Sequence, residues 1–378
     1  MFRPQIQKTR VLAVLALTSL LMVYISSNST VTDVALGYEY KLESAKIMDS
    51  AIKILKKEVK DKGYTIYKDI DPNTTGLIFK EDSPIRTGSG DLESKQTTLK
   101  SNFAALIVDE FIKAGISAGD TIAVGMTGSM PGANIALLSA CKAMNVYPVI
   151  ISSMGASMWG ATESDFTWID MEHILYKSAI FEKISIAYSL GGKGDCLRKS
   201  KNEDGRNLFE EKVKKYNIQK IDYSISDMNN LYKSIDQRID LFNDNIGSID
   251  NYVAYVNIGG GAASIGVGGK DRLNTPGYLK PKKVLSQKPN ESVARYFAEN
   301  NIPLVHVLHI QQFVKGILPF GSEKIPVGES RIYKQEKYNL IVNIIALFIS
   351  LGSVVFIGIK SHNQIKKRMQ SYEPESIL

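Results

Sequence analysis

Cysteine, histidine and tryptophan are scarce in this chain of 378 residues, which has two cysteines, four histidines and two tryptophans. Two cysteines are too few for the disulfide framework of small exported domains. We expect Cys141 and Cys196 to be unpaired thiols, with Cys141 buried in the apolar helix pattern ANIALLSACKAM. His306 and His309 fall on opposite faces of a predicted strand, so unless the segment is helical we expect packed, hydrogen-bonded histidines there and no shared zinc site.

Away from the chain ends, there is little excess of positive over negative charge. The net charge is +7, but residues 1–27 supply +3 and residues 338–378 supply +2, so the rest of the chain carries only +2. This near balance removes the general argument for nucleic acid as a partner. One local basic patch is left, at Lys280, Lys282, Lys283 and Lys288, and charge runs of this kind are usually solvated loops.

Two long apolar stretches are present, at residues 11–25 and 338–359. The second has no charged residue and reaches the roughly 20 residues that a helix needs to cross a membrane. Lysine and arginine lie on the terminal side of both stretches: Arg3, Lys8, Arg10, Lys360, Lys366, Lys367 and Arg368. Because cytoplasmic flanks are rich in these residues, the sequence predicts that both ends are cytoplasmic and that the body is extracytoplasmic.

The first apolar stretch also fits a signal peptide, but no A-x-A cleavage site follows it, so we predict an uncleaved anchor. The predicted organisation is a cytoplasmic basic tail at 1–10, a transmembrane signal anchor at 11–27, an amphipathic stalk helix at 28–62, an extracytoplasmic α/β domain at 63–337, a transmembrane helix at 338–359 and a cytoplasmic basic tail at 360–378. The predicted location is the cytoplasmic membrane. Whether 63–115 form a separate lobe stays open.

The body alternates β-branched runs with helical patterns, which predicts an α/β fold with a mainly parallel sheet and flanking helices. The expected strands are 121–126, 147–152, 184–189, 252–258 and 303–308. Four of them lead into glycine-rich turns, beginning at Gly125, Ser153, Gly191 and Gly259, the last running to Gly269. The carboxyl ends of parallel strands share one edge of a sheet, so we expect these turns to face a common ligand-binding site.

The first glycine turn leads from a strand into a helix and offers backbone amides to an anion. It is neither a P-loop, because Ala133 follows Gly132, nor a dinucleotide fingerprint, because the spacing of Gly125, Gly128 and Gly132 differs. The sequence therefore predicts no ATP or NAD site and no cofactor. The next stretch places Trp159 and Trp168 among serines and threonines, which suits either a ligand with apolar and amide portions or simple core packing.

Ser129 lies where the nucleophile of a strand-turn-helix motif would lie. The motif G-x-S-x-G is incomplete, because Thr127 and Pro131 replace its glycines. His173 as base and Asp170 as acid would complete a catalytic set if the fold brings them together. The alternative is a structural Gly-Ser turn that binds ligand or packs.

Four carboxylates, at 163, 165, 170 and 172, have no metal-loop spacing, so we predict helix capping by Asp165 or Asp170 and no metal. The predicted ligand-binding residues are Gly125, Thr127, Gly128, Gly132, Ser153, Trp159, Glu163, Gly191, Gly192, Lys193, Asn257, Gly259, Gly260, Gly261 and Ser264.

Three stretches, GMTGSMPGANIALLSA, IISSMGASMWGATESDFTWIDMEHIL and YVNIGGGAASIG, resemble the poly-γ-glutamate system protein family. The resemblance implies an accessory membrane protein that helps to make, export or anchor an anionic capsule polymer. It implies the poly-γ-glutamate synthase and export membrane proteins and the γ-glutamyl polymer as partners, and it carries no catalytic residue across.

Two functions follow as hypotheses. The first is a membrane-anchored factor that binds polymer or scaffolds the synthase complex, with glycine-turn amides, Lys193, Arg198 and the basic patch binding carboxylates. The alternative is an exported serine-type hydrolase or transferase that uses Ser129 on amide or ester bonds of the polymer or cell wall. A third hypothesis, a metabolite sensor, is disfavoured because the tail after Arg368 holds no output domain.

Overall fold

The computed structural model describes residues 9–198, 202–268 and 272–371, and the chain divides into two compact units. One unit is Met1–Val34 with Lys334–Leu378, and the other, here called the body, is Ala35–Tyr333. Parts of both predicted tails, at 1–8 and 372–378, and Gly269 of the fourth glycine turn lie outside the described residues.

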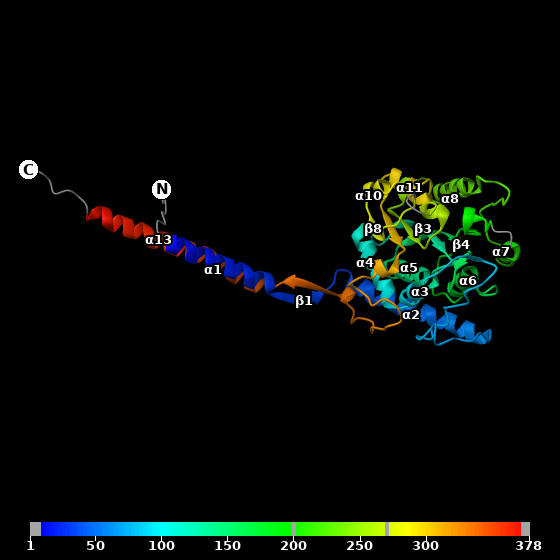
Figure 1. The fold of residues 1–378 in the computed structure, drawn as a ribbon, viewed down its shortest axis with the longest axis horizontal. Helices are drawn as coiled ribbons and strands as arrows, with labels where there is room; N and C mark the ends of the chain where they lie inside the picture. Colours follow the sequence, from blue (N-terminus) through cyan, green and yellow to red (C-terminus); the bar gives the residue numbers. More distant parts are fainter. Residues whose placement is uncertain (1–8, 199–201, 269–271, 372–378) are drawn as a thin grey trace, which may run out of the picture. The chain divides into compact units, whose positions relative to one another are not determined.

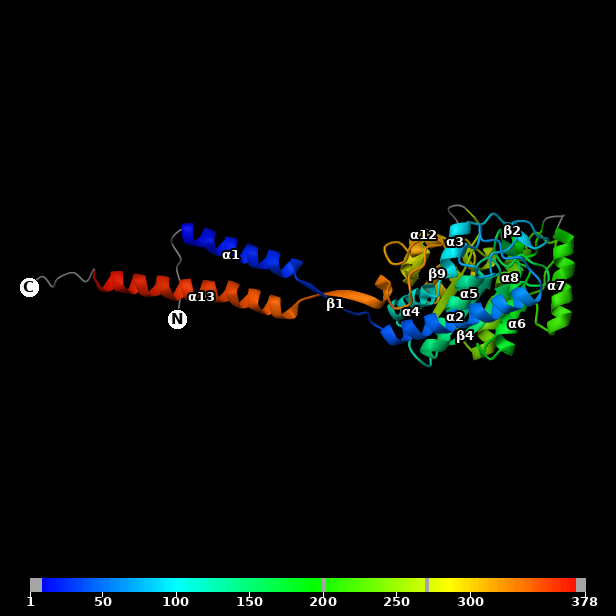
Figure 2. The same ribbon diagram turned by 90° about the horizontal axis from the view of Figure 1, so that it is seen from below.

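The terminal unit contains both apolar stretches as helices. Helix α1 is Thr9–Asn28 and helix α13 is Leu340–Gln370, and both are long and apolar enough to cross a membrane. They lie side by side (Figures 1 and 2). In the same unit, β1 (Thr30–Val34) pairs antiparallel with β10 (Lys334–Tyr338), and this ribbon was not predicted from the sequence. The two helices indicate membrane anchoring.

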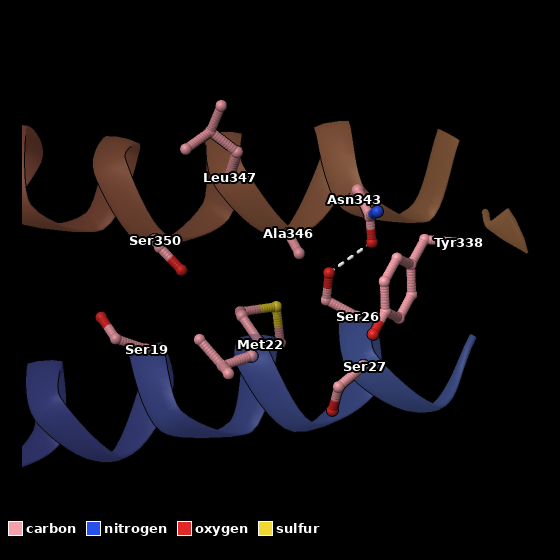
Figure 3. Close-up of a pocket in the computed structure, with 10 residues that line it drawn as sticks. Ser19, Met22, Ser26, Ser27, Tyr338, Asn343, Ala346, Leu347 and Ser350 are labelled. Carbon is pink, nitrogen blue, oxygen red and sulfur yellow. Dashed lines mark hydrogen bonds between the residues drawn. The ribbon is translucent and has the colours of Figure 1, made fainter. Parts of the chain in front are cut away.

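Polar and small side chains lie between α1 and α13. Ser26 donates a hydrogen bond to the Asn343 side-chain oxygen, and Ser19 and Ser350 line the same gap (Figure 3). Small residues let membrane helices approach closely, and a hydrogen bond between helices adds stability where no water competes. These contacts favour a packed helix pair over two independent anchors.

The body is built on a six-stranded sheet in the order β6-β4-β3-β7-β9-β8. All strands are parallel except β8, which pairs antiparallel with β9 at the edge. The bounds are β3 Thr121–Thr127, β4 Tyr147–Ser153, β6 Ala187–Ser189, β7 Ala254–Ile258, β8 Gly277–Leu279 and β9 Leu304–Val307. The five predicted strands and the mostly parallel sheet are confirmed, whereas β8 was not predicted.

Helices cover both faces of this sheet, because its strands are apolar on both sides. In β3, Ile122 and Val124 join one core cluster and Ala123 joins the other. The first cluster includes residues of α2 (Tyr38–Asp61), α4 (Asn102–Ala114), α5 (Pro131–Met144), α6 (Trp168–Lys177) and α12 (Ile310–Phe313). The second includes residues of α8 (Asn230–Ile246), α9 (Ala262–Ile265), α10 (Pro281–Ser286) and α11 (Val293–Glu299).

Shorter elements complete the body at the edges of these layers. Helix α3 is Leu92–Thr98, and α7, Glu203–Tyr216, places Phe209 in a third, smaller core cluster with Tyr188. Strands β2 (Arg86–Gly88) and β5 (Ala156–Ser157) form a separate parallel pair. Single 3-10 turns lie at η1 (Lys193–Asp195), η3 (Ile249–Asn251) and η5 (Arg331–Tyr333).

Helix α2 corrects the predicted stalk at 28–62. Its apolar face, with Met48, Ala51 and Leu55 fully buried, packs against α4 and α5 inside the body. An amphipathic pattern shows that a helix has a face to bury but not which partner buries it. The body therefore starts at Ala35, and segment 63–115 shares its core instead of forming a lobe, since Phe103 and Phe111 lie in the same cluster.

Candidate functional site

The body has a topological switch point between β3 and β7. From these central neighbours the chain moves to β4 and β6 on one side and to β9 on the other. Open α/β sheets bind ligands beyond the carboxyl ends of their strands at such a point. The residues that follow β3 and β7, from Thr127 and from Ile258, are therefore the first place to look for a site.

Beyond β7, the glycines bring several polar groups close to the bare backbone. Gly259 has a φ of +90°, and a Cβ there would collide with the Thr127 hydroxyl. A Cβ on the exposed Gly260 would collide with the guanidinium of Arg272. The positive φ of Gly259 favours glycine there, whereas the contact at Gly260 shows that the end of the Arg272 side chain lies directly against the bare backbone.

Asn257 and His306 lie beneath this loop and are completely buried. Asn257 Nδ2 donates to the Gly259 carbonyl oxygen at 2.7 Å and lies 3.0 Å from His306 Nδ1. Asn257 Oδ1 and His306 Nε2 have no hydrogen-bond partner of good geometry among the described residues. Buried polar atoms without partners are rare in folded proteins, and these two belong to residues paired across β7 and β9.

Arg272 supplies the positive charge of this cluster. Burial lowers the pKa of His306 to about 3, helped by the nearby positive charge of Arg272 and by His309, so His306 is neutral at physiological pH. Burial also lowers the pKa of Arg272, and no carboxylate among the described residues offsets that effect. Arg272 was not predicted from the sequence, where its only signal is its position shortly after the fourth glycine turn.

The glycines of the first turn have a packing role in the structure. A Cβ on Gly128 would collide with the carbonyl oxygens of Met154 and Gly155, and a Cβ on Gly132 would collide with the backbone at Thr98. The Gly128 amide already donates to the Ser153 carbonyl at 2.9 Å. These positions allow close backbone approach, and the amide of Gly128 is not free for an anion. Gly125 packs in the same way, against the Tyr255 and Ser264 hydroxyls.

Ser129 is half-buried, and its hydroxyl accepts a hydrogen bond from the Ser157 amide at 3.0 Å. No hydrogen bond among the described residues joins Ser129 to His173 or Asp170. The His173 ring lies on Tyr216, with centroids 4.1 Å apart, and its Nδ1 is 2.8 Å from the Ile169 carbonyl oxygen. The structure thus does not assemble the hypothesised catalytic set.

Asp170 has a structural role, as the capping prediction expected. It forms a capping box with Thr167 at the start of α6, and it accepts a hydrogen bond from Lys212 Nζ at 2.6 Å. These bonds lower the pKa of Asp170 in spite of its burial, so it remains ionised.

The other predicted ligand residues lie in several environments. Ser153 is buried 3.0 Å from the Ser189 hydroxyl, Trp159 is half-buried with a φ of +60°, and Glu163 forms an ion pair with Lys80 at 3.4 Å. Gly191 and Gly192 both have positive φ, Lys193 is exposed, Gly261 is half-buried and Ser264 is buried. Gly191 packs on Ser153 and so adjoins the carboxyl end of β4.

A buried lysine that the sequence analysis missed lies beside Ser129. Lys95 on α3 is 2% exposed, and its ammonium group donates to the Ser129 carbonyl oxygen and, at 2.8 Å, to the Ser157 hydroxyl. Burial lowers the pKa of Lys95 to about 7. Its position in a polar stretch, LESKQTT, gave no sign of burial.

Glu172 gives the body a pH-dependent stability. It is buried, accepts hydrogen bonds from Tyr188 at 2.5 Å and Ser185 at 2.9 Å, and burial raises its pKa from 4.5 to about 7. The folded body therefore holds this proton more tightly than the unfolded chain. The stability that the body gains by holding this proton is complete below pH 4.5 and is lost as the pH rises to about 7.

We expect Glu172→Gln to remove this pH dependence. Relative to the native protein, the variant should gain up to about 3 kcal/mol in free energy of unfolding as the pH rises from about 4.5 to 8. Urea unfolding of the full chain in detergent micelles at several pH values measures the difference. Parallel curves for the two proteins would contradict this, because they would show that folding does not change the pKa of Glu172.

Among the described residues, no three His, Cys, Asp or Glu side chains group as metal ligands would. Cys141 and Cys196 are both buried and unpaired. No protein-family model, curated protein or solved structure matches the chain.

Proposed function

We propose that this protein is a membrane-anchored accessory factor of poly-γ-glutamate capsule synthesis or export, and that its body binds the anionic γ-glutamyl polymer outside the cytoplasmic membrane. The resemblance of its glycine-rich stretches to the poly-γ-glutamate system protein family supports the pathway. The arrangement around Arg272 supports the binding.

The observation that carries the binding proposal is the guanidinium of Arg272 against the bare backbone of Gly260. A guanidinium binds carboxylates through two parallel hydrogen bonds, and such charge-assisted bonds are about twice as strong as neutral ones. A γ-linked glutamate chain presents one carboxylate in each unit. Neutral His306 and Asn257 add polar groups without a competing negative charge.

The anchoring helices support the membrane part of the proposal. Arg10 precedes most of α1, and α13 continues past its apolar portion through Lys360, Lys366, Lys367 and Arg368. The excess of basic residues at both ends favours cytoplasmic termini. Exposed apolar side chains on both helices, including Leu17, Leu20, Leu347 and Phe348, would face lipid or the synthase and export membrane proteins.

Calorimetry with oligo-γ-glutamate and the full chain in detergent micelles tests the binding. We expect saturable heat with the native protein and at least about tenfold weaker affinity for Arg272→Gln, because a hydrogen bond to a charged group is worth about 1.5–3 kcal/mol. The control is Arg295→Gln, which removes the same charge from an exposed arginine paired with Glu299.

The control variant should bind as the native protein does. Absence of binding by the native protein, or equal affinity of the Arg272→Gln and Arg295→Gln variants, would contradict the proposed function.

A further inference from the structure

Lys95 is an unusual lysine, because it is buried without a carboxylate. Its ammonium group contacts only the Ser129 carbonyl oxygen and the Ser157 hydroxyl among its hydrogen-bond partners in the described chain. The charge of Asp91 raises the pKa of Lys95 against the larger effect of burial, but the two form no ion pair in the described chain, and Asp91 caps α3 by accepting from the Ser94 amide at 2.9 Å. A buried, unpaired ammonium ion is strongly disfavoured, so this environment favours the neutral amine.

Ser157 is the hydroxyl that this amine reaches. It ends β5, whose pairing with β2 fixes the backbone, and its amide is held by the Ser129 hydroxyl at 3.0 Å. Ser157 is half-buried, whereas Lys95 is enclosed. As the neutral amine, Lys95 can accept the Ser157 hydroxyl proton across the 2.8 Å between Nζ and Oγ while it still donates to the Ser129 carbonyl, which is the geometry of an activated serine.

We propose that Ser157 and Lys95 form a serine-lysine catalytic pair for acyl transfer from an amide or ester, with Ser157 as the nucleophile and Lys95 as the general base. This activity goes beyond polymer binding. It also differs from the Ser129 hypothesis, because Lys95 contacts the backbone carbonyl of Ser129 and not its hydroxyl.

The reaction balances with these two groups and water. The Ser157 oxygen attacks the substrate carbonyl carbon while Lys95 takes the hydroxyl proton. The tetrahedral intermediate expels an amine or alcohol, which receives that proton from Lys95, and an ester to Ser157 remains. Water, deprotonated by Lys95, then attacks this ester, and the proton returns to Ser157 as the acid product leaves. Lys95 thus acts first as a base and then as an acid, both when the ester to Ser157 forms and when it is hydrolysed.

The position of the pair suggests its substrate. Ser157 follows β4, and Arg272 lies against the loop after β7, so both belong to the carboxyl edge of the same sheet. The γ-amide of the polymer bound at Arg272 is the candidate substrate. This last step rests on the proposed function, whereas the catalytic pair does not.

Covalent labelling of the full chain in detergent micelles tests the pair. The probes are an alkyl fluorophosphonate and a β-lactone, with the modified residue located by peptide mass spectrometry. We expect an adduct on Ser157, none on that peptide in Ser157→Ala, and at least about 100-fold slower labelling in Lys95→Met, since a positioned base contributes about 10²- to 10⁴-fold. Ser164→Ala, an exposed serine of the same loop, is the control and should label normally.

A second measurement covers the case in which Lys95→Met does not fold. Labelling of the native protein should speed up with a midpoint near pH 7, where Lys95 loses its proton. Failure of both probes to modify Ser157 in folded native protein, or a rate independent of pH from 5 to 9, would overturn the proposal. The probes carry no carboxylate, so this test and the calorimetry of polymer binding can fail independently.

Discussion

Replacing Arg238 by methionine is expected to lower the free energy of unfolding of the body by about 3–5 kcal/mol. Arg238 on α8 is 2% exposed, and its guanidinium donates to the Asp195 carboxylate at 2.9 Å and to the Ser189 hydroxyl at 2.6 Å. Asp195 is itself buried. Methionine fills much of the space but leaves the carboxylate, among the described residues, with only the Ser189 and Ser234 hydroxyls as partners, which is far less favourable than a paired charge.

Urea unfolding of the full chain in detergent micelles measures this loss. Both tryptophans, Trp159 and Trp168, lie in the body, so their fluorescence follows the body alone. The matched control is Arg295→Met, which breaks an exposed ion pair and should cost less than about 1 kcal/mol. The double variant Arg238→Met with Asp195→Asn should regain part of the stability, because no buried charge is then left unpaired.

A loss below about 1 kcal/mol in Arg238→Met would show that the pair does not hold the body together. The result bears on the site, because this network joins α8 to the ends of β4 and β6. Arg238 also reaches the Ser153 hydroxyl, at 3.4 Å, and Ser153 ends β4 at the edge where Ser157 follows. Replacing Arg238 should therefore disturb the carboxyl edge of the sheet as well as the core.

The architecture of the sheet was predictable because its signals are local. Each central strand is a short β-branched run bounded by turn residues, and each run leads to a helix of clear periodicity. The edge strand β8, Gly277–Leu279, is only three residues long and has no such run. The β1–β10 ribbon joins segments some 300 residues apart, so no local pattern could indicate its pairing.

The candidate site was less predictable, because its key residues depend on tertiary burial. Lys95 lies 34 residues before Ser129, in a polar helix that reads as a solvated surface. Arg272 is one of many basic residues, and only the fold sets it against Gly260. The glycines of the first turn were found, but the sequence does not tell close packing from an anion cradle, and the structure favours packing at Gly128 and Gly132.

The second large expected effect concerns the side of the membrane on which the body lies. A reagent that cannot cross the membrane either labels a cysteine or leaves it unlabelled, depending on that side. The native cysteines should react little with a thiol reagent, because Cys141 and Cys196 are buried and burial raises the pKa of both. Two exposed methionines offer matched sites for a new cysteine. Met228 is in the body and 79% exposed, and Met369 follows the apolar portion of α13 and is 66% exposed.

The most direct test of whether the body meets an exported polymer is to label these two variants with a membrane-impermeant maleimide. The cells are intact, and their outer layers admit the reagent. The account predicts that Met228→Cys is labelled in intact cells and that Met369→Cys is labelled only after the cytoplasmic membrane is opened. Protection of Met228→Cys until the membrane is opened, with Met369→Cys labelled from outside, would place the body in the cytoplasm and contradict the account.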